Sequence, residues 1–415
     1  MVLLAVAVVC AAAYAGGVLA AAVGQPRALG EIAAGIGLGP TLLGAFLPGV
    51  SSTLFSPSVA GTLNTLARLG VILFVFFIGA ELDSELQWLR WRLLGPLVTV
   101  NLGLPVIAGV AIAFPLYAHL AGPDAGHTAF ALFVGVAAGT TALPVLAAIL
   151  DDLGLSATAL GRLSLGAAAV TDIGAWSLLA LVAASAGHGG ASQAALRVGG
   201  AACLALVVLG IVRPLFRRVL AAVPAGASGV VQTVVGIGLA IALATATEHI
   251  GVSVVLGALL AGAAIGRPPA GQQPLSAGAR RVNRALLLPV FFAATGLRID
   301  LGSGWSAGLF AAAACVLVVA AMVKITGVTY AATWSGLTGR DAVGLGFLLN
   351  TKGLTEIVVL RLGYDLGLLS RPAFGVLVVA ALLATAATTP ALQLLGLVPR
   401  ADTPTLPAEQ LAASD

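Results

Sequence analysis

Gly139-Thr140-Thr141, with Pro144 close behind, interrupts an apolar run over residues 128–150, and Asn350-Thr351-Lys352-Gly353 interrupts a second run over residues 340–362. Proline removes a backbone N–H and frees a carbonyl one turn earlier. At membrane depth such a break is tolerated only where the backbone lines a cavity or lies against protein. The two interruptions therefore predict two discontinuous helices; a simple proline kink satisfied by the threonines is the alternative for the first.

The composition around these breaks is that of a membrane protein. Hydrophobic residues make up 60% of the 415 residues and charged residues only 9%, where a soluble domain carries about 25%. A mean hydropathy of +1.08 excludes a soluble multi-domain enzyme. We expect an all-α polytopic protein with about thirteen transmembrane helices, near 2–23, 27–45, 58–80, 93–118, 128–150, 156–186, 191–213, 228–247, 250–266, 283–297, 304–335, 340–362 and 372–397. The first run lacks a basic leading segment, which favours a retained helix over a cleaved signal.

Three pairs of segments indicate an internal repeat. The run from Val75 to Asp83 is similar to the run from Val290 to Asp300, and glycines cluster both at 30–39 and at 257–266. The two interrupted helices form the third pair. The members of each pair lie seven helices apart, and an odd offset means that the two copies enter the membrane from opposite sides. Inverted repeats of this kind are typical of secondary transporters with crossed, broken helices.

The basic residues predict the orientation. With the N-terminus outside, thirteen arginines fall on the cytoplasmic side and five on the outer side, so the C-terminus is expected in the cytoplasm and the protein in the cell membrane. The net charge of +4 lies in loops and gives no reason to expect a nucleic-acid partner. The only two lysines, Lys324 and Lys352, both fall inside predicted spans.

Asp172 is the strongest candidate for the functional group. It lies in the middle of the predicted helix over 156–186, where an ionised carboxylate costs about 2.5–3.5 kcal/mol. A carboxylate in such surroundings can hold a proton or a hard cation such as Na⁺ or K⁺. The alternative is a structural role, capping a broken helix or pairing with a buried lysine. Lys324 is predicted to pair with Asp172 when no cation is bound, with snorkelling to the interface as the alternative.

The broken helices supply the remaining candidates. The freed carbonyls and the hydroxyls of Thr140 and Thr141 are plausible cation ligands. Lys352 and Glu356 are four residues apart, so they share a helix face, and Lys352 is expected to neutralise the C-terminal end of a half-helix at its own break. The acidic pair Asp151-Asp152 is interpreted as a solvated helix end.

No cofactor is expected. No strand precedes the glycines at positions 35, 37 and 39, which favours close helix packing over a dinucleotide site. The three cysteines have neither disulfide nor metal-site spacing, so no metal is expected beyond a transported cation.

Four motifs resemble the monovalent cation:proton antiporter-2 family, which includes Kef-type potassium efflux systems, bacterial Na⁺/H⁺ antiporters and plant cation/H⁺ exchangers. They are QPRALGEIAAGIGLGP at 25–40, FFIGAELD at 76–83, FFAATGLRID at 291–300 and NTKGLTE at 350–356. The resemblance covers essentially the whole chain. It implies a secondary active transporter, and not an enzyme, that contributes to pH homeostasis.

The resemblance also implies a homodimer with an elevator-like mechanism inside one membrane domain over 1–400. A moving core would comprise residues 93–186 and 304–397, and a scaffold 1–80 and 228–297; residues 191–213 would link them, and 401–415 would form a short cytoplasmic tail. Asp172 falls at the family's cation- and proton-binding aspartate, and Lys324 at a lysine of the core. The implied set is completed by Thr171, Thr140, Thr141, Lys352, Glu356, Asn350, Thr351 and Pro144.

Two departures from the family pattern bear on function. Thr171 stands where many electrogenic members have a second aspartate, so one carboxylate would alternate between H⁺ and a cation, K⁺ first and Na⁺ second, without net charge movement. No C-terminal nucleotide-binding domain follows, which leaves room for a separate regulatory subunit. Two alternatives are a Na⁺-coupled organic-anion symporter and a non-transporting sensor or channel subunit on the same fold.

Overall fold

The computed structural model describes residues 1–82, 91–123, 125–186, 191–221, 225–251, 253–266, 275–302 and 304–398. Their regular structure is helical, with one isolated antiparallel bridge between Ala121 and Leu369. Among these residues, eleven helical segments are long and apolar enough to cross a membrane. The prediction of an all-α polytopic membrane protein is confirmed; the predicted tail over 401–415 and Asp83 of one repeat motif lie outside the described residues.

The first half of the chain contains α1 (Val2–Ala22), α2 (Arg27–Leu38), α3 (Leu43–Phe46), α4 (Pro48–Leu54), α5 (Pro57–Leu82), α6 (Trp91–Leu120), α7 (His127–Gly139), α8 (Leu143–Asp152) and α9 (Ala159–Ser185). The rest contains α10 (Ala191–Val207), the π-helical turn η1 (Val208–Val212), α11 (Arg213–Ala221), α12 (Ala225–Ile250), α13 (Val254–Ile265), α14 (Ala277–Val282), the π-helical turn η2 (Asn283–Leu287), α15 (Leu288–Leu297), α16 (Ala307–Trp334), α17 (Gly339–Leu349), α18 (Leu354–Asp365), α19 (Arg371–Ala386) and α20 (Thr388–Leu394).

Helix is present in all thirteen predicted segments, although several boundaries differ. The segment predicted over 27–45 ends its main helix at Leu38, because Gly39 is extended and Pro40 follows it. The segment over 250–266 becomes helical only at Val254, where the Ser253 hydroxyl accepts the Val255 N–H as an N-cap. The segment over 372–397 is divided into α19 and α20.

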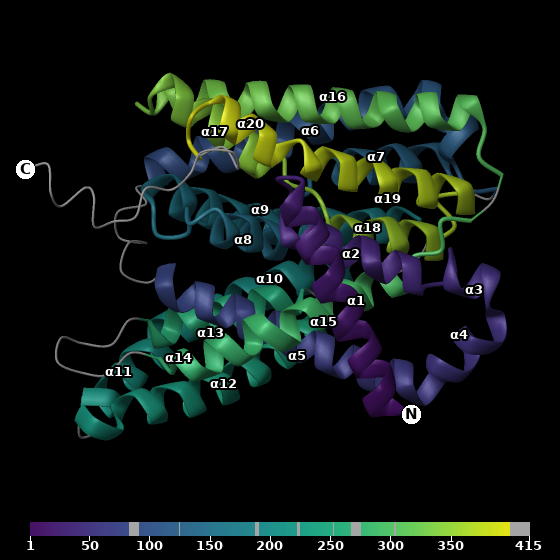
Figure 1. The fold of residues 1–415 in the computed structure, drawn as a ribbon. Helices are drawn as coiled ribbons and strands as arrows, with labels where there is room; N and C mark the ends of the chain where they lie inside the picture. The colour runs from purple at the N-terminus through teal and green to yellow at the C-terminus, as the bar shows by residue number, and fades with distance from the viewer. Residues whose placement is uncertain are drawn as a thin grey trace, which may run out of the picture.

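Figure 1 shows two groups of helices. One group contains α6 to α9 and α16 to α20, and the other contains α5 and α10 to α15, with α1 and α2 packed against α15. Ion pairs join the groups at two places: Arg284 of η2 contacts Asp151 at the end of α8, and Arg371 of α19 donates to Asp300 after α15. The second contact holds the pKa of Asp300 below its usual range.

The interrupted helices form the centre of the first group. In an apolar 18-residue window of the span His127–Asp152, which contains α7 and α8, 94% of the residues are buried, and in the corresponding window of Gly339–Asp365, which contains α17 and α18, 72% are buried. The other candidate spans in the described part of the chain are less buried. The irregular backbone of each break is therefore shielded from lipid by protein, as the absence of water at membrane depth requires.

Glycines allow α2 and α15 to pack backbone to backbone. A Cβ on Gly35 would lie 2.0 Å from the Ala293 carbonyl oxygen, and one on Gly296 would lie 2.1 Å from the Ile32 carbonyl oxygen. Neither position has room for a side chain. The expectation that the glycines near position 35 serve helix packing is confirmed for Gly35, because small residues let membrane helices approach closely.

Candidate functional site

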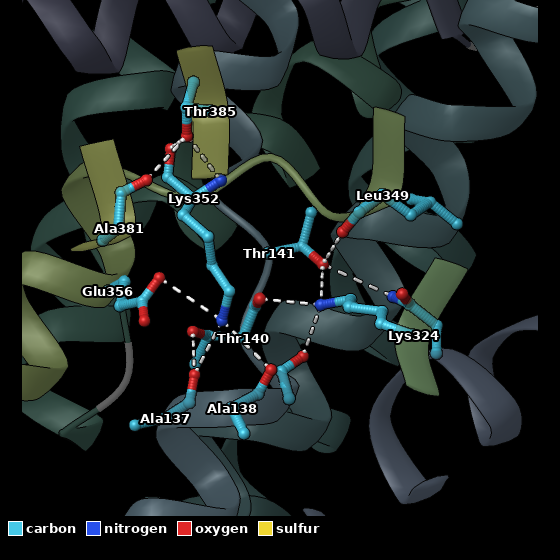
Figure 2. A network of polar contacts seen from close by, with 12 residues as sticks. Ala137, Ala138, Thr140, Thr141, Lys324, Leu349, Lys352, Glu356, Ala381 and Thr385 are labelled. Atoms are coloured by element: carbon cyan, nitrogen blue, oxygen red, sulfur yellow. Dashed lines mark hydrogen bonds and ion pairs between the residues drawn. The ribbon is translucent and has the colours of Figure 1, made fainter. Parts of the chain in front are cut away.

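The two broken helices are bonded to each other at their breaks. α7 ends at Gly139 and α8 begins at Leu143; α17 ends at Leu349 and α18 begins at Leu354. The Ala142 N–H donates to the Thr351 carbonyl at 3.0 Å, and the Thr141 hydroxyl donates to the Leu349 carbonyl at 2.8 Å. The crossing is therefore one connected unit and not two independent kinks (Figure 2).

Lys324 of α16 caps the C-terminal end of α7. Its ammonium donates to the carbonyl oxygens of Gly139 and Thr140 at 2.8 and 2.7 Å and to the Thr141 hydroxyl at 2.8 Å, and the side chain is fully buried. The Thr140 carbonyl lies in the extended break between α7 and α8 and has no helical partner there, so Lys324 supplies its donor. The positive charge also lies at the negative end of the α7 dipole.

Lys352 binds the same helix end from the other side. Its ammonium donates to the carbonyls of Ala137 and Ala138, both at 3.0 Å, and lies 3.3 Å from Glu356 Oε2 (Figure 2). The structure contains the expected i,i+4 pair. The helix end assigned to Lys352 was wrong, however: the lysine neutralises α7 and not the half-helix at its own break, because its side chain reaches across the crossing.

Thr385 of α19 holds the backbone of the second break. Its hydroxyl accepts the Lys352 N–H at 2.9 Å and donates to the Lys352 carbonyl at 2.6 Å. Both groups lack a helical partner because Lys352 lies in the break between the end of α17 at Leu349 and the start of α18 at Leu354. The hydroxyl is fully buried and substitutes for the missing helical bonds.

We expect Thr385→Val to destabilise the protein by about 1–2 kcal/mol, since the isosteric valine leaves two buried backbone groups unpaired. The measurement is the melting temperature of the purified protein in detergent. Thr326→Val is the matched control, because the exposed Thr326 hydroxyl bonds only carbonyls of its own helix. Equal melting temperatures for the two variants would contradict the role assigned to Thr385.

The predicted ion pair between Lys324 and Asp172 is not formed in this conformation. Both residues are described by the structure, and no ion pair joins them, since the three bonds of Lys324 all go to the crossing. The pairing was therefore wrong for this state. The carbonyl end of α7 offers a fully buried ammonium several acceptors at once, and a desolvated cation requires such partners.

Asp172 lies in α9 with only 5% of its surface exposed. Its Oδ1 atom has no hydrogen-bond partner within 3.5 Å among the described residues, and the indole N–H of Trp176, one turn further along α9, is the donor that lies near the carboxylate. The neighbouring Thr171 is fully buried, and its hydroxyl donates to the Ala167 carbonyl at 2.8 Å. Asp172 therefore has a free oxygen where buried polar atoms are normally paired, which suits a site for a proton or a cation.

Two cavities lie between α5 and α9, one towards each end of α5. The first, the Trp176 cavity, has a volume of about 620 Å³ and is lined by Arg68, Trp176 and residues of α13, α15 and α18. The second, the Arg284 cavity, has a volume of about 290 Å³ and is lined by Glu81, Leu165 and Arg284. Asp172 lines neither.

The spacing along α9 places Asp172 between the two cavities. Leu165, Asp172 and Trp176 are seven and four residues apart, so the three side chains share one helix face. At 1.5 Å per residue, Asp172 lies about 10 Å from the level of Leu165 and about 6 Å from that of Trp176. The two cavities thus approach the level of the carboxylate from opposite directions along α9, and Asp172 lines neither of them.

The acidic pair at the end of α8 is better paired than expected. Asp151 Oδ2 lies 2.9 Å from Arg284, and Asp152 Oδ2 accepts the Arg27 N–H at 3.1 Å. Both carboxylates are partly exposed, in keeping with the interpretation as a solvated helix end, and α2 and η2 in addition present donors to this end of α8. The pair links the two groups of helices and lies away from Asp172.

The sequence interpretation missed Asn101 of α6. The side chain is fully buried, and its Nδ2 donates to the Thr171 hydroxyl at 2.9 Å and to the Thr141 hydroxyl at 3.4 Å. It therefore connects α9 with the crossing. An amide in the apolar run over 93–118 was the available signal, but a single neutral polar residue does not identify its partners.

The chain was compared with protein families and known proteins. The family described as sodium/hydrogen exchanger, transmembrane, matches residues 4–394. The Na(+)/H(+) antiporter NhaS4 of Synechocystis is 35% identical over 90% of this chain and 92% of its own length. Cation/H(+) antiporter 19 of Arabidopsis thaliana is 35% identical, and K(+)/H(+) antiporter 1 of Saccharomyces cerevisiae is 32% identical, each over 89% of this chain.

The match to these relatives differs in extent. The chain spans 46% of the Arabidopsis protein and 43% of the yeast protein. Among solved structures, the sodium proton antiporter MjNhaP1 of Methanocaldococcus jannaschii matches with a TM-score of 0.58, covering 95% of this chain and 99% of that one. The two are 11% identical, so the likeness establishes the fold.

Proposed function

The chain belongs to the sodium/hydrogen exchanger family as a monovalent cation/proton antiporter, and we propose that the exchange takes place at Asp172. The observation that carries the proposal is the position of this carboxylate between two cavities at opposite ends of α5. If the Asp172 carboxylate is accessible from one cavity at a time, it can release a proton to one side and bind a cation there, and do the reverse on the other side. The chain thus acts as a transporter and not as an enzyme.

The proposed movement is that of an elevator. The core helices over 93–186 and 304–397 would move against a scaffold formed by 1–80 and 228–297, with 191–213 as the linker. The bonded crossing supports this division, because Lys324, Thr385 and both breaks lie within the proposed core. A rigid core carries Asp172 past α5, so that the carboxylate opens first to one cavity and then to the other.

The charge of the site supports electroneutral exchange. The ammonium groups of Lys324 and Lys352 are held by carbonyls of the crossing, and Glu356 is paired with Lys352. These three charges need not change during transport. Asp172 is neutralised equally by one H⁺ or one monovalent cation, and Thr171 supplies no second charge. The loaded carrier therefore has the same charge in both directions.

In proteoliposomes, we expect a cation gradient to move protons without creating a membrane potential. The measurement combines an internal pH dye with a voltage dye, for K⁺, Na⁺ and Li⁺ in turn, with K⁺ expected to be the best substrate. Protein-free liposomes give the leak. A voltage signal that grows with the exchange rate would contradict one-for-one stoichiometry, and absence of flux with every cation would contradict the proposed activity.

Two further proposals concern assembly and placement. The family resemblance implies a homodimer, and native mass measurement in detergent tests it. The arginine distribution supports an N-terminus outside the cell membrane and a cytoplasmic C-terminus. Under this orientation the Arg284 cavity opens to the cytoplasm and the Trp176 cavity to the outside, which thiol labelling of single-cysteine variants at either cavity would check. A separate regulatory subunit would be sought by copurification.

A further inference from the structure

We propose that Asn101 is a cation ligand of the exchange site: its amide nitrogen holds the Thr141 and Thr171 hydroxyls, and its amide oxygen coordinates the transported cation. The inference rests on the proposed exchange at Asp172 and adds a residue to it. In this proposal Asn101 takes part in cation binding and not in proton binding.

The hydrogen bonds around Asn101 determine the orientation of its side-chain amide. The hydroxyl of Thr171 donates to the Ala167 carbonyl, and that of Thr141 donates to the Leu349 carbonyl, each at 2.8 Å. Each hydroxyl proton is thus already used, so each oxygen can only accept from Asn101. The nitrogen of the amide must therefore face the two threonines, and the oxygen must face elsewhere.

The amide oxygen of Asn101, Oδ1, is buried without a hydrogen-bond partner in the described part of the protein. Both amide atoms are bonded to one carbon, so Oδ1 lies within about 5 Å of the Thr171 oxygen. Asp172 follows Thr171 directly, and its Oδ1 is buried and unpaired as well. The two unpaired oxygens thus belong to a residue that bonds to Thr171 and to the residue that follows Thr171 in the chain.

The proton and the monovalent cation differ in the protein ligands that they need. A proton forms a covalent bond with one carboxylate oxygen and needs no further ligand. A monovalent cation must leave its hydration shell, and protein oxygens have to replace the lost water. The Asn101 oxygen meets this need without adding charge, so the electroneutral exchange is preserved.

The lysines strengthen the assignment. The backbone carbonyls freed at the first break were expected to be cation ligands, but the carbonyls of residues 137–140 all accept from Lys324 or Lys352. The ammonium groups beside these carbonyls disfavour a second cation there in this conformation, because like charges repel. Asn101 lies next to the crossing, and its buried amide oxygen has no hydrogen-bond partner among the described residues.

The test measures cation affinity in Asn101→Leu, which is nearly isosteric but has no polar atoms. In proteoliposomes we expect the half-saturating cation concentration to rise roughly tenfold, with a smaller change in maximal rate. The stabilisation of the purified protein by added K⁺ or Na⁺, measured as a melting shift, should fall in parallel. This second readout does not require transport.

Gln232→Leu is the matched control. Gln232 is also fully buried, donates from Nε2 to the Gly266 carbonyl and has an unpaired Oε1, but it belongs to α12 in the proposed scaffold. A general effect of losing a buried amide would appear in both variants, and a change in cation affinity only in Asn101→Leu. If Asn101→Leu does not fold, Asn101→Ser replaces it, with the same expected direction.

Unchanged half-saturation and an unchanged cation-dependent melting shift in the Asn101 variant would overturn the inference and indicate that water pairs with the amide oxygen. The result is separable from a failure of the proposed function. Exchange that persists in Asp172→Asn refutes the exchange site itself. An inactive Asp172→Asn variant together with normal cation affinity in Asn101→Leu refutes only the role of Asn101.

Discussion

Asp172→Asn is expected to reduce cation/proton exchange by at least about a hundredfold. Asparagine has nearly the same shape but can neither bind a proton near neutral pH nor neutralise a cation. Asp172 is only 5% exposed and lies among apolar residues, where charged groups are costly. We therefore expect no other carboxylate to take over its function in the variant. The measurement is cation-driven dequenching of a pH dye in everted membrane vesicles, normalised to the amount of protein.

Asp365→Asn is the control for this prediction. Asp365 is an exposed carboxylate of α18, in the proposed core, and it pairs with Arg361 at the surface. Its loss should leave exchange within about twofold, because exposed ion pairs contribute little. If Asp172→Asn retains the dequenching seen in the unmodified protein, the exchange site lies elsewhere.

Lys324→Met is expected to cause the largest loss of stability. The substitution keeps the length of the side chain and removes the donor to Gly139, Thr140 and Thr141. Each buried acceptor left unpaired costs about 1–3 kcal/mol, and the end of α7 also loses a neutralising charge. Together these effects predict a destabilisation of about 3 kcal/mol or more, with impaired exchange because the crossing is no longer held together.

The melting temperature in detergent checks this prediction, with Arg361→Met as the control for removal of an exposed positive charge from α18. Lys324→Arg retains the charge but not the compact ammonium, so an intermediate melting temperature is expected. A Lys324→Met variant that melts and transports like the unmodified protein would show that the three bonds are dispensable. A variant of normal stability whose exchange has a shifted pH dependence would instead favour the direct partnership with Asp172.

Several features of the protein followed from the sequence alone. The thirteen helical segments are visible because lipid requires long apolar stretches whatever their neighbours. The breaks at Thr140 and Lys352 are equally local, since proline, glycine and polar residues interrupt such a stretch wherever it lies in the fold. Asp172 stands out for the same reason: a carboxylate in a bilayer is costly in any packing arrangement, so its presence indicates a function.

The partners of these residues were decided by the tertiary structure. Lys324 could bind a carboxylate or the carbonyl end of a half-helix, and the sequence gives no distance to either; it binds Gly139, 185 residues away, because α16 passes the end of α7. Asn101 became a candidate site residue only because folding brings it to Thr141 and Thr171. Hydropathy and helix breaks act over one turn or one span, whereas a hydrogen bond requires atoms about 3 Å apart, and packing alone determines which distant atoms meet.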